Sequence, residues 1–144
     1  MATNTLIQSL NPGAYNDVSN RRQQETFLAT EAIAVGQAVA FDFAKTDDAD
    51  KMLYVRKAST NADERHFVGI ALSAASAGEK VNVVISGIVT GTVAAGTAAD
   101  TCVSIGGTEG ELVTYVNTSV NPIVARTVGA EAGGKALMVV IRQF

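Results

Sequence analysis

Cysteine, histidine and tryptophan are nearly absent from this sequence, which contains one Cys, one His and no Trp. A lone cysteine excludes an internal disulfide and a metal site built from several thiolates, and it fits a reducing compartment. Charged residues are also scarce, at 17% of the chain against about 25% in a typical soluble domain. Because so little of the surface is charged, we expect other subunits to cover part of it.

Basic residues are few and scattered. The formal net charge is -3, and the longest basic run is the pair Arg21 and Arg22, so the electrostatic footprint of a nucleic-acid-binding protein is missing. The N-terminal stretch MATNTLIQSLNPGAY has neither a basic nor an apolar region, and no apolar run reaches about 18 residues, the length of a membrane span. We therefore expect no nucleic acid or membrane as a partner, and no cleaved export signal.

Small and β-branched residues make up nearly half of the 144 residues, with 23 Ala, 18 Val, 14 Thr and 13 Gly. From Glu25 onward, short apolar runs alternate with clusters of Gly, Asp and Ser, which is typical of strands joined by turns. This pattern predicts one compact all-β body with at most one or two turns of helix. The strands are expected within residues 34–43, 52–58, 66–72, 80–93, 101–106, 110–116, 121–128 and 135–144.

The first of these runs alternates in side-chain size. Val39, Phe41 and Phe43 are separated by smaller or polar residues, so they share one face, and we expect this strand to be half buried. The acidic segment 46–51 is expected to be a solvated turn. Residues 52–58 then pair with the preceding strand as a hairpin.

A motif recurs along the chain. VGIALSAASAGEKVNVVI at residues 68–85 returns in shortened form as VGAEAGGKALMVVI at residues 128–141, and AVGQAVAF (34–41) and AAGTAADTCVSI (94–105) are fainter versions. We expect the first two copies to share a strand-turn-strand shape. Each version has a glycine shortly before a strand, where a turn needs a positive φ or a close approach of backbone. These glycines are Gly36, Gly78, Gly96 and Gly133.

Residues able to act as a nucleophile, a base or a metal ligand are few. His66 stands where a strand is expected to begin, and Cys102 lies in the alternating run TCVSI, where a small side chain is usually buried in the core. Neither has a partner at a recognisable catalytic spacing. Calcium-loop, Walker A and dinucleotide-binding motifs are missing from the sequence. We therefore predict that the protein is not an enzyme and has no catalytic, metal or cofactor site, no cofactor and no small-molecule substrate.

The first part of the chain differs from the rest. Residues 1–24 show neither helical nor strand periodicity and are broken by the tripeptide NPG. In a free tail the apolar side chains of this segment would be left in water, so we predict a docking arm at 1–24 and a folded domain at 25–144. The alternative is a frayed terminus. The side chains expected to anchor the arm to a partner are Leu6, Ile7, Leu10 and Tyr15.

Three stretches, EAIAVGQAVAFD (31–42), VGIALSAASAGEKVNVVISGIVTG (68–91) and VGAEAGGKALMVVI (128–141), resemble the capsid decoration or cement proteins of tailed bacteriophages. The likeness covers about residues 25–144. It implies a β-barrel or β-tulip body that binds the lattice of the major capsid protein as a homotrimer and stabilises the head. It also implies a place on the outer surface of the virion capsid, after synthesis in the cytoplasm of the host bacterium. The alternative is another phage structural β protein, such as a tail-tube, tail-tip or fibre component.

Overall fold

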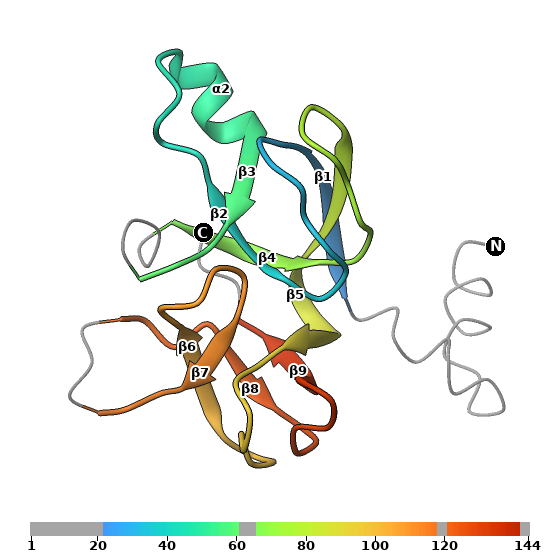
Figure 1. Ribbon diagram of the computed structural model, residues 1–144, viewed down its shortest axis with the longest axis vertical. Helices are drawn as coiled ribbons and strands as arrows, with labels where there is room; N and C mark the ends of the chain where they lie inside the picture. Colours follow the sequence, from blue (N-terminus) through green and yellow to red (C-terminus); the bar gives the residue numbers. More distant parts are fainter. Residues whose placement is uncertain (1–21, 61–65, 118–120, 142–144) are drawn as a thin grey trace, which may run out of the picture.

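The computed structural model describes residues 22–60, 66–117 and 121–141 (Figure 1). Strands dominate these ranges, and the one helix within them is short, so the expected all-β fold is confirmed. The elements are β1 (Gln23–Ala29), β2 (Ala38–Phe41), α2 (Asp48–Leu53), β3 (Tyr54–Lys57), β4 (Phe67–Ala71), β5 (Lys80–Thr92), β6 (Cys102–Ile105), β7 (Leu112–Thr114), β8 (Ala125–Thr127) and β9 (Lys135–Val140).

Five strands form a closed barrel. Their order is β1-β3-β2-β4-β5, and β1 also pairs with β5, which completes the ring. β1 and β3 are parallel, and the other neighbouring pairs in this ring are antiparallel. Closure pairs the backbone groups that an open sheet leaves at its edges. The barrel is therefore confirmed, as is the hairpin between β2 and β3.

Strand β5 is long enough to serve a second sheet. Its first part pairs with β1 and β4, and residues 87–92 pair with β9. The second sheet continues from β9 to β8, β6 and β7. A parallel bridge between Val93 and Leu112 then brings the end of β5 back to β7. β5 is thus common to two rings, and Figure 1 shows it running from one half of the molecule into the other.

The two rings have the same topology. If the second part of β5 is matched with β1, then β6, β7, β8 and β9 correspond to β2, β3, β4 and β5, with the same neighbours in the same orientations. The repeated motif follows this correspondence. Residues 68–85 cover the antiparallel pair β4 and β5, and residues 128–141 run from the end of β8 through the antiparallel β9. The first copy therefore has the expected strand-turn-strand shape, whereas the second begins after β8 and contains β9 alone. Both copies belong to an internal repeat of a five-strand unit.

Glycine makes the turns of this repeat possible. Gly36, Gly78 and Gly96 have φ of 91°, 84° and 79°, and each is the third residue of a four-residue turn closed by a backbone hydrogen bond. A positive φ there is typical of a type II turn and favours glycine. Gly133 and Gly134, with φ of 62° and 76°, are the two central residues of the tight turn before β9, as a type I′ turn requires. The predicted positive φ is confirmed at all four positions.

Two hydrophobic clusters fill the molecule, and β2 lies between them. Val39 and Phe41 belong to the cluster inside the barrel. Ala38 and Ala40 belong to a second cluster, in which side chains on the outside of the barrel pack against the second sheet. The prediction of a half-buried strand is therefore wrong, because the second sheet covers the other face of β2. Phe43 lies beyond the strand and is 46% exposed, so it does not share the inner face.

Two further elements differ from expectation. The acidic segment 46–51 is not a turn, because helix α2 starts in it. Asp47 caps this helix by accepting a hydrogen bond from the backbone N–H of Ala49 at 3.0 Å, a role for which Asp is well suited. β1 is not among the expected strands. It begins at Gln23, two residues before Glu25, where the folded domain was expected to start.

Candidate functional site

The four side chains expected to anchor an arm on the capsid lie outside the described residues. They are Leu6, Ile7, Leu10 and Tyr15. The described chain begins at Arg22, one residue before β1. The anchoring role of these four residues therefore stays a prediction.

His66 lies immediately before β4. Its ring stacks on that of Phe43, with 3.9 Å between the ring centroids and 21° between the ring planes. The buried Nδ1 of His66 makes no hydrogen bond. Stacking on Phe43 makes His66 part of the packing at the start of β4.

Cys102 is half-buried, which differs from the core position predicted for it. It begins β6, opposite Arg126 of β8, and the next residue, Val103, is the one that points into the core. The phase of the strand therefore places the thiol on the outer side. Cys102 belongs to the second ring and His66 to the first.

Metal-ligating side chains do not gather within residues 22–60, 66–117 and 121–141 in groups of three or more. In the same ranges, no helix has the length and apolar character needed to cross a membrane. The surface feature that stands out in the described chain is apolar.

The outer side of β9 is aliphatic where a solvated strand is usually polar. Every second residue of this strand is buried, and the residues between them include Leu137 and Val139, which are 43% and 39% exposed. Ile141, at the next outward position, is 44% exposed. Val128 is 53% exposed and lies beside Leu137, since its N–H donates to the Leu137 carbonyl at 2.7 Å. The sheet thus presents a stripe of aliphatic side chains.

This surface extends onto neighbouring strands, because directly paired residues project to the same side of a sheet. Ile88 of β5 pairs with Val139, and Val139 pairs in turn with Arg126 of β8. The result is a row of side chains that crosses three strands. We name this surface the β9 face, and it comprises Ile88, Arg126, Val128, Leu137, Val139 and Ile141.

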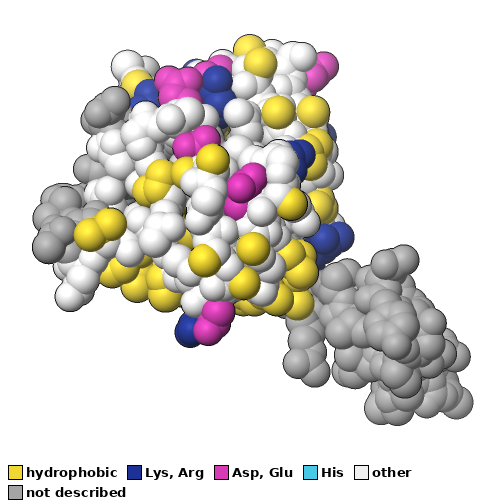
Figure 2. All heavy atoms as spheres, turned by 60° about the horizontal axis from the view of Figure 1, so that its bottom comes forward, with side chains coloured by type: hydrophobic (Ala, Val, Ile, Leu, Met, Phe, Trp, Pro, Cys, Tyr) yellow, Lys and Arg dark blue, Asp and Glu magenta, His cyan; other side chains and the backbone are white. Residues whose placement is uncertain are grey.

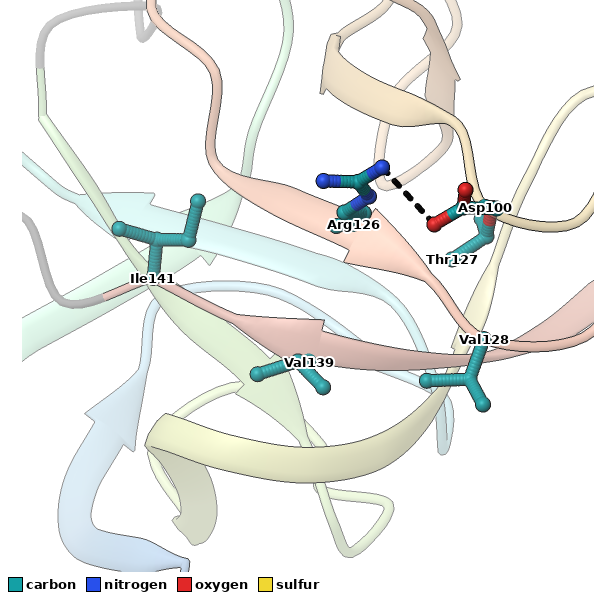
Figure 3. Close-up of a pocket in the computed structure, with 6 residues that line it drawn as sticks. All are labelled: Asp100, Arg126, Thr127, Val128, Val139 and Ile141. Atoms are coloured by element: carbon teal, nitrogen blue, oxygen red, sulfur yellow. Dashed lines mark ion pairs between the residues drawn. The ribbon is translucent and has the colours of Figure 1, made fainter.

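A shallow depression of about 610 Å³ lies in the β9 face (Figure 3). Val128, Val139 and Ile141 line it, and Arg126 and Asp100 stand beside them. Nη2 of Arg126 is 2.8 Å from Oδ1 of Asp100, and both side chains are more than half exposed. Figure 2 brings this end of the molecule forward and shows hydrophobic side chains spread over it. The site can therefore bind by apolar contact, with an ion pair at its side.

Sequence reasoning placed residues 135–144 on a strand but gave them no function. The signal was present in KALMVV, where the odd and the even positions are both apolar apart from the first lysine. A strand with one face in water alternates between apolar and polar residues. An apolar pattern on both faces indicates that a partner or a second layer covers the outer one.

One charged cluster joins the two rings. Nζ of Lys57 lies 3.3 Å from Oε2 of Glu31 and 3.3 Å from Oε2 of Glu109. Burial disfavours the charge on Lys57, but its hydrogen bonds to Glu109 and Glu31 outweigh this and raise the pKa of the lysine. Glu31 follows β1 and Glu109 lies between β6 and β7, so the cluster is a structural link between the barrel and the second sheet.

A second cluster ties two glycine turns together. The Glu131 carboxylate accepts hydrogen bonds from the N–H of Gly134 at 2.6 Å and from the N–H of Gly96 at 3.2 Å. These two bonds stabilise the ionised form and lower the pKa of Glu131. Glu131 therefore joins the turn before β9 to the turn that follows β5.

No family model and no curated protein matches this sequence. Among solved structures, the fold is similar to that of the N base of head fiber gp8.5 in bacteriophage phi29, with a TM-score of 0.59 and 14% sequence identity. The alignment covers 84% of this chain and 95% of that chain. At this identity the likeness is one of fold, and it extends over nearly the whole of that base.

Proposed function

We propose that this protein is a structural protein of a bacteriophage head, and that it binds the outside of the capsid as a decoration protein. The observation that carries the proposal is the fold shared with the phi29 head-fiber base over 84% of the chain. The resemblance of residues 25–144 to cement proteins of tailed phages supports the same class on separate grounds, because it was drawn from sequence motifs.

The proposed binding unit is a homotrimer seated on the lattice of the major capsid protein. A surface with few charges and an exposed aliphatic sheet face suits contacts between protein subunits. A trimer that binds the assembled shell, and not its dissociated subunits, stabilises the head by mass action. This function requires no catalytic group, and we assign none to His66 or Cys102.

The direct test mixes the purified full-length protein with heads of its own phage from which it is missing. Cosedimentation gives the affinity and the number of copies per head, and negative-stain images give their positions. We expect saturable binding at discrete sites in multiples of three copies, together with a higher temperature of head disruption. Heads of an unrelated phage serve as the control. A failure to saturate the cognate heads would refute the decoration role.

The arm is tested by a truncation that leaves β1 whole. Deletion of residues 2–21 keeps Gln23, which pairs with Ser86 of β5. We expect the β-sheet circular dichroism signal to remain and the affinity for heads to fall tenfold or more, which is about 1.4 kcal/mol. A full-length variant with serine at the four anchor positions separates the anchors from the length of the arm. Equal affinity for all three proteins would mean that the segment is a frayed terminus.

A fibre component is the second candidate, and the head fiber in the name of the phi29 structure favours it. Images of decorated heads separate the two candidates. Globular projections at capsomer junctions support a decoration protein, and an elongated projection from each bound base supports a fibre.

A further inference from the structure

We propose that the β9 face is the surface at which copies of this chain pack against one another. This inference rests on the proposed function, a multimeric head protein, and adds to it the place where the copies meet. The occupant of the face is a second copy of the chain. The capsid and the N-terminal segment are the competing occupants, and the experiment below separates them.

The internal repeat supplies the first reason. When the two copies of the repeated motif are aligned at Lys80 and Lys135, Val139 of β9 corresponds to Val84 of β5. Both project outward from their ring. Val84 has no exposed surface, because it packs in the cluster that joins the barrel to the second sheet. Val139 is 39% exposed. The same outward position is therefore covered in the first ring and open in the second.

A neighbouring pair of positions supplies the second reason. Leu137 of β9 corresponds to Asn82 of β5. Asn82 faces water, and its Oδ1 accepts a hydrogen bond from Oγ1 of Thr26 at 2.8 Å. Leu137 presents an aliphatic side chain that is 43% exposed. A solvated position is thus polar in the first ring and aliphatic in the second, as expected for a surface that a partner covers.

The β9 face has the composition of an interface core. Four of its aliphatic side chains, Val128, Leu137, Val139 and Ile141, are between 39% and 53% exposed. Together they form one exposed apolar patch, and such patches on soluble proteins are often functional. A standard interface buries about 800 Å² on each partner, with an apolar core of this kind inside a polar rim.

The charges beside the face suit an identical partner. Arg126 and Asp100 carry opposite charges, and both side chains are accessible. A rim of one sign would repel a second copy of the same surface. A mixed rim lets Arg126 of one copy approach Asp100 of the next. The face therefore fits another copy of this chain better than it fits a strongly charged partner.

The test compares Leu137→Asn with the matched control Met52→Asn. The first ring carries asparagine at the position of Leu137, so this residue is compatible with the strand. Met52 is 54% exposed in α2, at the other end of the molecule from β9 (Figure 1). A second variant, Val139→Asp, places a charge in the middle of the face. Light scattering after size exclusion gives the molar mass over a range of concentrations, and circular dichroism reports the fold.

We expect the wild type and Met52→Asn to form the same trimer. Leu137→Asn and Val139→Asp should keep the β-sheet signal and associate at least tenfold more weakly. Where the wild type is a monomer in solution, chemical cross-linking of protein bound to heads makes the same comparison. Two folded variants that associate as strongly as the wild type overturn the proposal.

Binding to heads separates this proposal from the proposed function. If the variants remain trimeric but no longer bind heads, the face binds the capsid, and the proposed self-interface is overturned. If deletion of residues 2–21 weakens association as much as Leu137→Asn does, the N-terminal segment is the occupant of the face. This result overturns the self-interface as well. If the wild type forms a trimer that requires Leu137 but does not bind heads, the self-interface is supported. The decoration role is then refuted.

Discussion

Replacing Gly69 with alanine should destabilise the fold strongly, whereas the same change at Gly129 should not. Both glycines follow a valine at the start of the repeated motif, so the two substitutions are matched in local sequence. A Cβ added at Gly69 would lie 2.1 Å from the carbonyl oxygen of Val84 and 2.8 Å from its carbonyl carbon. A Cβ added at Gly129 would meet no atom within 4 Å.

The magnitude follows from what the new methyl group would touch. The clash at Gly69 is with backbone of the neighbouring strand, and β4 and β5 would have to separate by about 1 Å within a closed barrel to relieve it. Overpacking a core costs about 1–3 kcal/mol, and we expect a loss at the upper end of this range or beyond it. Gly129→Ala should change stability by less than about 1 kcal/mol, with a stabilising contribution from the stiffer unfolded chain.

Urea unfolding followed by far-ultraviolet circular dichroism measures both changes. A domain of this size has about 5–15 kcal/mol of stability, so the expected loss at Gly69 should lower the urea midpoint clearly while the slope stays constant. Gly129→Ala is the control, because it adds the same methyl group at a position where the group meets no other atom. Equal midpoints for the two variants would refute the reasoning, because they would mean that β4 and β5 do not approach as closely as described.

Three further changes test other parts of the structure. Ile70→Ala should cost about 2–5 kcal/mol in the same urea assay, since its fully buried side chain packs in the cluster shared by both rings. Glu131→Gln should lower the urea midpoint at pH 7. In the variant, this midpoint should also fall less steeply than in the wild type as the pH is lowered into the acid range. The stabilisation from Glu131 is fully present above the ordinary pKa of 4.5 and is lost as the pH falls through the lowered pKa of the folded state. If the variant kept the acid dependence of the wild type, this would contradict the two bonds to Gly96 and Gly134. Cys102→Ser should bind heads like the wild type and unfold within about 1 kcal/mol of it, because the thiol is half-buried, and a folded variant that no longer binds heads would show that the thiol has a role.

Local features of the fold were predictable from the sequence because their causes are local. Gly36, Gly78 and Gly96 mark turns since few other residues adopt a positive φ without strain. Strand positions followed from apolar runs between such turns. Helix α2 could also have been predicted, because an acidic run that begins with Asp47 is a helix N-terminus as well as a turn signal.

Features that depend on distant contacts could not be predicted in the same way. Whether Ala38 faces water or a core depends on the second sheet, whose strands β6 to β9 are built from residues more than sixty positions later. Cys102 and Val103 both suit a core, and only the pairing of β6 with β8 decides which of them points inward. The exposure of Val139 depends on what lies outside the chain, so no pattern within one sequence identifies its partner.

The shared strand β5 also has a consequence for how the protein is made. On the ribosome, β1 to β5 emerge first and can close their barrel, while residues 87–92 wait for β9, the last strand of the described chain. Until β9 arrives, this part of β5 is an open edge, and outward side chains of the barrel such as Ile70 and Val84 remain in water. Open edges and uncovered aliphatic surface promote aggregation of nascent chains. We therefore expect a chain that stops before residue 135 to aggregate or to be degraded, and not to form a smaller working subunit.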